Sequence, residues 1–303
     1  MTNAGYDNQL YILAFDHRTS FQTKLFGIAG TPTDDERRRI REAKRIILDG
    51  LLAAAADAPD RTVGALTDEE NGGDAAREAK AHGLVLAMSA EKSSLPEFDF
   101  EYGEGFGRHI EAFEPDFVKI LARYNPQGDG ELNRRQAERL ARLSDWLAPR
   151  STKYLFELLV PPTAAQLEAT GSDAARFAAE LRPGLVVTAI EELQAAGVEP
   201  DVWKVEGLDT ADDCRRVASA ARTGGRDNVG CVVLGAGADE ATVAHWLRQA
   251  AGVEGFIGFA IGRTIFWDAL SAWLAGADRE TAVRQIADNY RATVELYRGA
   301  VVA

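Results

Sequence analysis

Eight short apolar runs rich in β-forming residues recur along the 303-residue chain, and longer amphipathic stretches separate most of them. The runs expected to form strands are residues 11–16, 63–67, 84–88, 117–121, 154–160, 202–205, 229–234 and 256–261. A strand followed by a helix, repeated eightfold, is typical of a parallel (β/α)8 or TIM barrel. The sequence therefore predicts an α/β fold with one such barrel over residues 1–303.

Amphipathic periodicity predicts the helices between these strands, and Asp, Thr or Ser near several starts supplies capping signals. The expected helices include residues 34–55, 133–147, 183–196, 211–221 and 240–251. Residues 160–183 form a long irregular insertion after the fifth run, and we predict that they act as a lid over the barrel mouth. A doubly wound open sheet is the alternative, but Gly235-Ala236-Gly237 lacks the third glycine of a dinucleotide fingerprint.

Composition limits the partners of the chain. A formal net charge of -13 and a pI near 4.9 argue against nucleic acid or an anionic membrane as the main partner. The two cysteines, Cys214 and Cys231, lie in a helix-like and a strand-like segment, so we expect no disulfide framework and a reducing cytoplasm. No segment resembles a signal peptide or approaches the roughly 18 apolar residues of a membrane span. We expect a cytoplasmic protein with a small-molecule partner, and a homo-oligomer is left open.

Polar side chains gather where the predicted strands end, which is where barrels of this kind carry their active groups. They are Asp16, His17, Arg18, Asp68, Glu69, Glu70, Glu91, Lys92, Lys119, Arg123, Glu157, Lys204 and Glu206. The last two strands end in Gly235-Ala236-Gly237 and Gly262-Arg263-Thr264. Barrels often bind a phosphate there, on backbone amides and a helix N-terminus, and Arg263 would add a positive charge.

Lys204 places an amine inside an apolar strand. Strand alternation puts Lys204 on the inner face and Trp203 on the outer face, against the helices. An amine at the end of a barrel strand is partly desolvated, which favours its neutral form and lets it attack a ketone to form a Schiff base. The structural alternative is a buried ion pair with Glu157 or Glu206.

Lys119 and Glu157 belong to neighbouring predicted strands and are expected close to Lys204. Repulsion between two barrel lysines, together with desolvation, would lower the pKa of an amine from about 10.4 toward roughly 7 to 8. Apolar neighbours would raise the pKa of Glu157 unless the lysines keep it ionised, and the sequence leaves that balance open. Lys119 could also serve only to neutralise Glu157.

Other polar residues also have structural alternatives. Asp16 and Arg18 could be a loop ion pair, and Gly262-Arg263 could be a simple helix-opening turn. The acidic run at residues 68–70 is expected to be a solvated loop, and the alternative left open is that it places a metal or a substrate hydroxyl.

For Glu91 and Lys92, which follow the third strand, the structural alternative is a surface ion pair. The four histidines are scattered and form no paired motif, so no metal and no cofactor are predicted.

Six segments resemble the aldolase-like domain that some bacteria carry fused behind 5-dehydro-2-deoxygluconokinase in inositol catabolism. They are AFDHR at 14–18 with Ser20 and Phe21, EFDFEYG at 97–103, KILARYNP at 119–126, FELLVPP at 156–162, DVWKVEG at 201–207 and GFAIGRT at 258–264. The resemblance spans nearly the whole chain, and we expect it to act as a stand-alone protein without a fused kinase domain. More distantly, the chain is similar to class I tagatose-bisphosphate and sulfofructose-phosphate aldolases, whose motifs include an Asp-Gln-Arg, a Glu on strand five and a Lys-Val-Glu on strand six.

The resemblance implies a class I aldolase, a carbon-carbon lyase. Its substrate would be a phosphorylated keto-sugar acid such as 5-dehydro-2-deoxygluconate 6-phosphate, and its products dihydroxyacetone phosphate and malonate semialdehyde. It implies Lys204 as the Schiff-base lysine and Glu157 as acid/base, with Lys119 and Asp16 beside the reacting carbonyl. The implied binding residues are Gly235, Gly237, Gly262 and Arg263 for a phosphate and Arg18 or Arg123 for a carboxylate.

Two positions depart from these relatives. His17 stands where the distant aldolases have Gln, and Ala236 stands where the kinase-fused domains usually have Arg, which removes a cation from the expected anion site. The alternatives left open are an aldolase for another keto-sugar phosphate or a sulfosugar phosphate, a metal-dependent lyase or isomerase, and a non-catalytic sugar-phosphate-binding protein.

Overall fold

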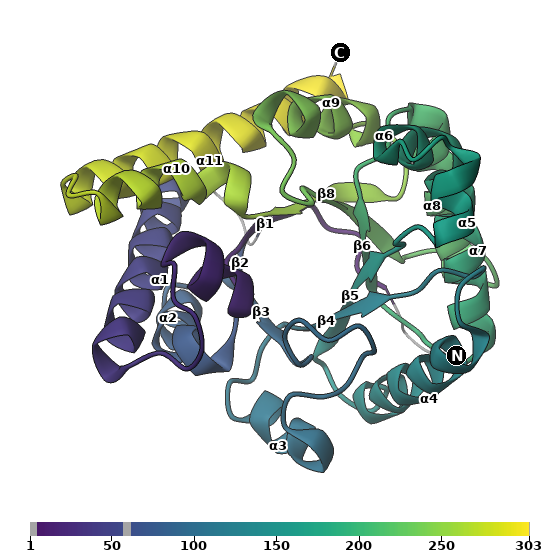
Figure 1. Cartoon of the computed structure of the whole chain (residues 1–303), viewed down its shortest axis with the longest axis horizontal. Helices are drawn as coiled ribbons and strands as arrows, with labels where there is room; N and C mark the ends of the chain where they lie inside the picture. The colour runs from purple at the N-terminus through teal and green to yellow at the C-terminus, as the bar shows by residue number, and fades with distance from the viewer. Residues whose placement is uncertain (1–4, 57–61, 303) are drawn as a thin grey trace.

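The eight strands of the computed structural model, which describes residues 5–56 and 62–302, close into a ring of parallel strands (Figure 1). The strands are β1 (Leu10–Ala14), β2 (Val63–Thr67), β3 (Val85–Ser89), β4 (Phe117–Arg123), β5 (Lys153–Leu159), β6 (Val202–Glu206), β7 (Gly230–Leu234) and β8 (Phe256–Ile261). They pair in chain order, and β8 pairs with β1. The predicted (β/α)8 barrel is confirmed, and the doubly wound sheet is wrong.

Helices surround the ring of strands (Figure 1). They are α1 (Asp34–Ala55), α2 (Glu69–Ala81), α3 (Phe106–Glu111), α4 (Gly130–Leu147), α5 (Ala164–Ala169), α6 (Ala174–Arg176), α7 (Arg182–Ala195), α8 (Ala211–Arg222), α9 (Glu240–Ala250), α10 (Arg263–Leu274) and α11 (Arg279–Val302). Short π-helical segments lie at Phe21–Leu25 and Phe177–Leu181, and a 3-10 turn lies at Gly103–Gly105.

Two apolar layers hold the barrel together. Inward side chains such as Ile12, Leu66 and Val232 fill the ring, while the outward side chains of the strands pack against the helices. On β6 this alternation buries Trp203 completely in the outer layer and leaves Lys204 on the inner face, as the strand pattern predicts.

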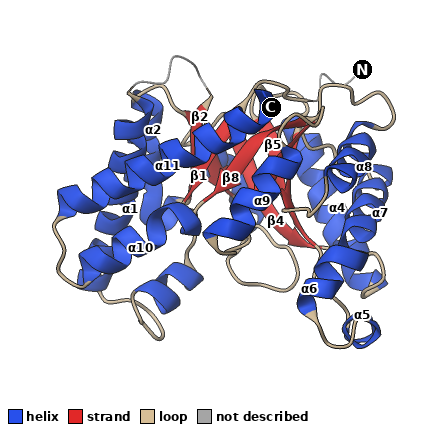
Figure 2. Ribbon diagram, turned by 90° about the horizontal axis from the view of Figure 1, so that it is seen from above, coloured by secondary structure: helices blue, strands red, loops and turns tan. Residues whose placement is uncertain are grey.

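Residues 160–183 contain α5, α6 and the π-helical segment before α7. Figure 2 shows α5 and α6 at the edge of the molecule, outside the strands. Asn125 holds this segment, because its amide donates to the carbonyl of Pro161 and to Oε1 of Gln166, both at 2.7 Å. The cavity described below is lined without any of these residues. Their action as a lid stays a prediction.

The sequence analysis expects no disulfide framework and no membrane-spanning segment. Cys214 and Cys231 are free and buried in the outer layer. Among the helices of residues 5–56 and 62–302, none is long and apolar enough to cross a membrane.

Candidate active site

A cavity of about 350 Å³ lies at the carboxyl ends of the strands. All of the predicted site residues line it: Asp16, Arg18, Lys119, Arg123, Glu157, Lys204, Gly235, Gly237, Gly262 and Arg263. They lie on or just after β1, β4, β5, β6, β7 and β8, and the closed ring brings these strand ends together although they are far apart in the sequence. The prediction that the strand ends share one site agrees with this geometry.

Strand register brings Glu157 and Lys204 together. The two residues are direct partners in the β5–β6 pairing, and both face inward. Lys204 Nζ donates to Oε2 of Glu157 at 2.9 Å, and only 2% of Lys204 is exposed. The buried ion pair expected as the structural alternative is therefore present, and its lysine also borders the cavity.

Glu206, the other carboxylate considered as a partner of Lys204, contacts different residues. It accepts from Arg182 Nη1 at 3.3 Å and from the backbone N–H of Val160 at 3.2 Å. Burial raises the pKa of Glu206, and the charge of Arg182 opposes that rise. Of the two carboxylates considered for Lys204, Glu157 is the one it contacts.

Lys119 lies at the centre of three carboxyl groups. Its Nζ atom is 2.7 Å from Asp16 Oδ2, 2.9 Å from Glu157 Oε2 and 3.0 Å from Glu91 Oε1. Burial lowers the pKa of Lys119, but these three carboxylates raise it well above its ordinary value. The expectation that lysine repulsion lowers this pKa is wrong for Lys119, because the three carboxyl groups within 3.0 Å of its Nζ atom raise the pKa.

The same charges decide the ionisation of Glu157 and Asp16. Burial tends to raise the pKa of Glu157, but Lys119 and then Lys204 lower it below its ordinary value. Burial also opposes ionisation of Asp16, and Lys119, Lys204 and His17 bring its pKa well below the usual range. The balance that the sequence left open thus favours an ionised Glu157.

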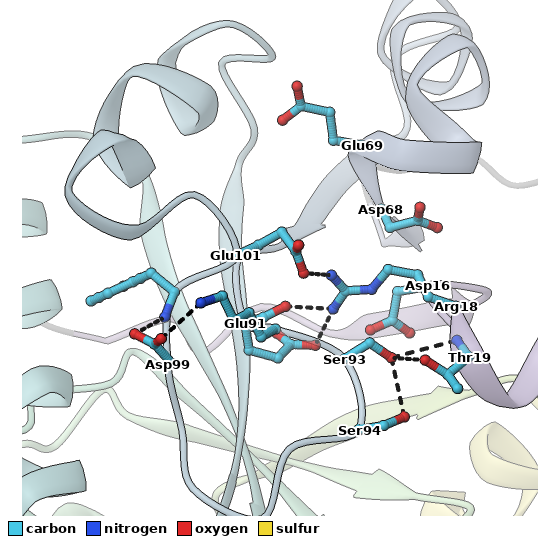
Figure 3. Close-up of polar contacts among 12 residues, drawn as sticks. Asp16, Arg18, Thr19, Asp68, Glu69, Glu91, Ser93, Ser94, Asp99 and Glu101 are labelled. Carbon is cyan, nitrogen blue, oxygen red and sulfur yellow. Dashed lines mark hydrogen bonds and ion pairs between the residues drawn. The ribbon is translucent and has the colours of Figure 1, made fainter. Parts of the chain in front are cut away.

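Glu91 is a site residue that the sequence analysis placed at a strand end but to which it gave no role. Glu91 is 6% exposed, and its Oε1 atom contacts both Lys119 and Arg18; Figure 3 shows the contact with Arg18. Lys92 Nζ pairs instead with Asp99 Oδ2 at 2.9 Å. The surface pair considered as the structural alternative is therefore wrong. Its position directly after a strand end was the available signal, since the other catalytic candidates share that position.

Arg18 is largely committed to protein carboxylates. Its guanidinium donates to Glu91 Oε1 at 3.2 Å and to Glu101 Oε2 at 2.8 Å (Figure 3). The loop ion pair considered for Arg18 therefore exists, but with Glu91 and Glu101, while Asp16 pairs with Lys119.

Arg123, unlike Arg18, is not paired with a carboxylate among the residues that the structure describes. Its Nη1 atom donates to the carbonyl of Leu95 at 2.8 Å, and no carboxylate within the described part of the chain pairs with it.

The acidic run at residues 68–70 is built into the fold. Asp68 is 1% exposed, pairs with the buried Lys44 and accepts the N–H of Asn71 to cap α2. Glu69 contacts His109 Nδ1 at 3.0 Å. The solvated loop expected here is wrong for Asp68. Among the residues that the structure describes, no group of three or more His, Cys, Asp or Glu side chains is placed to hold a metal ion.

The turn after β7 and the start of α10 form one end of the cavity. Gly237 has a φ of +76°, and a Cβ there would lie 2.0 Å from Arg263 Nη2, so glycine lets the guanidinium lie close over the turn. A Cβ at Gly262 would lie 2.0 Å from the carbonyl oxygen of Ala14. No side chain caps α10. Within residues 5–56 and 62–302, no ion pair is found for Arg263. This end of the cavity therefore has an uncapped helix start beside an arginine without a carboxylate partner in these ranges.

His17 borders this end of the cavity as a neutral ring. Burial lowers the pKa of His17 to about 4, with Asp16 opposing the shift and Arg263 adding to it. Its Nδ1 atom is buried and has no hydrogen-bond partner among the described residues. A neutral imidazole can therefore offer a ring nitrogen to a bound molecule.

The fold and this geometry define a (β/α)8 barrel with a buried lysine–carboxylate network at the carboxyl ends of its strands. The chain belongs to the family described as "Uncharacterized protein conserved in bacteria (DUF2090)", whose model matches residues 2–301. A comparison with curated proteins gives no match.

Solved structures of aldolases share the fold. Fructose-bisphosphate aldolase from Plasmodium falciparum, in complex with TRAP and a small-molecule inhibitor, has a TM-score of 0.63 at 14% identity, over 98% of this chain and 92% of that one. A Schiff-base-forming fructose-1,6-bisphosphate aldolase has a TM-score of 0.59 at 16% identity, over 96% and 94%. The Slackia heliotrinireducens fructose-bisphosphate aldolase has a TM-score of 0.55 at 15% identity, over 92% and 85%.

Proposed function

We propose that this protein is a class I aldolase that forms a Schiff base through Lys204 and cleaves an anionic keto-sugar. The observation that carries the proposal is the contact of one carboxylate oxygen, Glu157 Oε2, with two lysine Nζ atoms, each at 2.9 Å, beside a cavity. The carboxylates of Asp16 and Glu157 keep one lysine of this pair, Lys119, as a cation, which leaves Lys204 as the nucleophile. The fold shared with Schiff-base aldolases supports the same chemistry.

Imine formation begins with a proton transfer along the ion pair. Lys204 gives a proton to Glu157 Oε2, 2.9 Å away, and becomes a neutral amine. The amine attacks the ketone carbon of the substrate, and a proton of the attacking nitrogen moves to the former ketone oxygen, which gives a carbinolamine. Glu157 then returns its proton to this hydroxyl, the carbon-oxygen bond breaks, water leaves and the nitrogen lone pair forms the iminium. Lys119 stays charged beside the reacting oxygen and stabilises negative charge there.

Bond cleavage uses the ionised form of Glu157. Its carboxylate takes the proton of the hydroxyl β to the iminium, and the electron pair of the neighbouring carbon-carbon bond moves toward the iminium nitrogen. An aldehyde leaves and an enamine remains on Lys204. Protonation of the enamine carbon and hydrolysis then release a ketone. Asp16 would keep Lys119 in place during these changes, since their side chains lie 2.7 Å apart.

Two cations that lack a carboxylate partner in the described chain suggest how the substrate is oriented. Arg263, with the turn at Gly235 and Gly237 and the uncapped start of α10, suits a phosphate group. Arg123 suits a carboxylate at another part of the cavity, because Arg18 already binds Glu91 and Glu101. A phosphorylated keto-sugar acid carries both groups.

The finer proposal is that the substrate is 5-dehydro-2-deoxygluconate 6-phosphate, as in inositol catabolism. Cleavage would give dihydroxyacetone phosphate and malonate semialdehyde. The support is the resemblance of the six sequence segments together with the separate positions of Arg263 and Arg123.

The test is to supply this substrate and measure released dihydroxyacetone phosphate, with and without a metal chelator. The proposal predicts turnover that a chelator leaves unchanged. Turnover lost on chelation would favour a metal-dependent lyase. Binding of the substrate without any product would favour a silent sugar-phosphate-binding protein.

A further inference from the structure

Glu91 is the third carboxyl group at the Lys119 ammonium, and its two oxygens are used unequally. Oε1 lies 3.0 Å from Lys119 Nζ. It also lies 3.2 Å from Arg18 Nη2, a contact that Figure 3 shows. Oε2 is buried and has no hydrogen-bond partner among the described residues. A buried carboxylate oxygen without a donor is costly. This oxygen therefore needs a donor from a bound molecule or a proton of its own.

The charges around Lys119 favour a proton on Glu91. Three carboxyl groups, those of Asp16, Glu91 and Glu157, share one ammonium group, and carboxylates this close repel one another. Asp16 and Glu157 have pKa values below their ordinary range. Burial raises the pKa of Glu91 despite the opposing charges of Lys119 and Arg18, and Asp16 raises it further. The proton of this cluster is thus held most readily by Glu91.

We propose that Glu91 is a second catalytic acid, which delivers a proton from Oε2 to the enamine carbon that bond cleavage leaves on Lys204. This inference rests on the proposed aldolase function. In this inference Glu91, and not Glu157, supplies the proton that the enamine carbon takes up.

The carboxyl groups of Glu157 and Glu91 occupy different positions in the site. Glu157 contacts Lys204 Nζ directly, so it serves the atoms nearest the imine nitrogen. Glu91 is linked to Lys204 only through Lys119 and Glu157, yet it lines the same cavity. The enamine carbon is two bonds from the nitrogen, farther along the substrate. An ionised base and a neutral acid at different positions allow one site to remove one proton and supply another.

The step balances without any further reactant. The nitrogen lone pair of the enamine forms the carbon-nitrogen double bond, and the carbon-carbon π pair takes the proton from Glu91 Oε2 to form a C–H bond. Glu91 becomes a carboxylate, held by Lys119 and Arg18. Water hydrolyses the iminium, and solvent in the cavity returns the proton to Glu91.

The experiment measures two reactions of dihydroxyacetone phosphate with the full chain. Borohydride trapping reports imine formation on Lys204, and loss of a C–H proton signal in D₂O, followed by NMR, reports exchange through the enamine. Glu91→Gln keeps an oxygen for Lys119 and Arg18 and places an amide where Oε2 was, without a transferable acid proton. We expect trapping at the wild-type level and exchange slowed by about 100-fold or more. Glu91→Asp, which keeps an acid, should restore part of the exchange.

The matched control is Glu101→Gln, which removes the other carboxylate from Arg18 but is not among the residues that line the cavity. It should exchange at the wild-type rate. Exchange in Glu91→Gln at the wild-type rate overturns the inference. So does a joint loss of trapping and exchange, because Glu91 would then only hold Lys119 in place.

If Glu91→Gln does not fold, Glu91→Asp decides: slowed exchange with intact trapping supports the role, and any other result overturns it. Absence of trapping in the wild-type protein contradicts the proposed function itself, and with it this inference.

Discussion

Glu157 and Lys204 are in register on adjacent strands, and their Oε2 and Nζ atoms lie 2.9 Å apart at the edge of a cavity. The same Glu157 oxygen lies 2.9 Å from Lys119 Nζ. An ionised carboxylate shared by two buried amines can accept a proton from one amine while the other stays charged. This relationship is the basis of the proposed chemistry.

Replacing Glu157 with Gln should abolish this exchange of protons. The amide keeps the size of the side chain but accepts no proton at working pH, so turnover should fall by about 10² to 10⁴-fold. Steady-state release of dihydroxyacetone phosphate measures the effect. Glu138→Gln, at an exposed position of α4, is the matched control and should behave as wild type. Wild-type turnover in Glu157→Gln would remove this residue from the mechanism.

Lys44→Met should destabilise the fold. The substitution leaves Asp68 buried without its partner, and breaking a buried pair costs about 3 to 5 kcal/mol. Urea denaturation measures the free energy of unfolding. The exposed pair of Arg38 and Asp35 provides the control, because Arg38→Met should cost less than about 1 kcal/mol. Equal losses of unfolding free energy in the two variants would show that the buried Lys44–Asp68 pair stabilises the fold no more than the exposed pair does.

The stability of the protein should depend on the ionisation of Asp16. Its folded-state pKa lies below the value of about 3.9 expected in the unfolded chain, so the unfolded state binds more protons as pH falls. The stabilisation is complete above about pH 5 and is lost as the pH falls through 4 toward the folded-state pKa. Asp16→Asn should therefore flatten the stability curve between about pH 5 and 3. Denaturant titrations at several pH values give this slope, and an unchanged slope would count against the ion pair with Lys119.

Arg263→Ala should weaken phosphate binding selectively. The guanidinium has no carboxylate partner within the described residues, and a charge-assisted contact of about 1.5 to 3 kcal/mol corresponds to a loss of roughly 10- to 100-fold in affinity. Calorimetry with dihydroxyacetone phosphate and with uncharged dihydroxyacetone separates the contributions, since only the first should weaken. Arg248→Ala, at an exposed position of α9, serves as control. Equal weakening of both ligands would place the phosphate elsewhere.

The fold was largely predictable because each barrel strand is a short apolar run that differs from the helices around it. Lys204 illustrates this: its strand, inward direction and cavity all follow from alternation and from its place at a strand end.

Long-range ion pairs could not be predicted in the same way. Lys44 and Asp68 are 24 residues apart, and Arg18 and Glu91 are 73 apart, so no local pattern marks either contact. The rise in the pKa of Lys119 depends on three carboxylates from three other strand ends, which only the closed ring brings together.

The central claim is that the Lys204 amine captures a ketone. The most direct measurement is to treat the protein with dihydroxyacetone phosphate and borohydride and to locate the reduced adduct by mass spectrometry. We expect a single adduct on Lys204 and none in Lys204→Met. An adduct on Lys119 instead, or one that persists in Lys204→Met, would contradict the account.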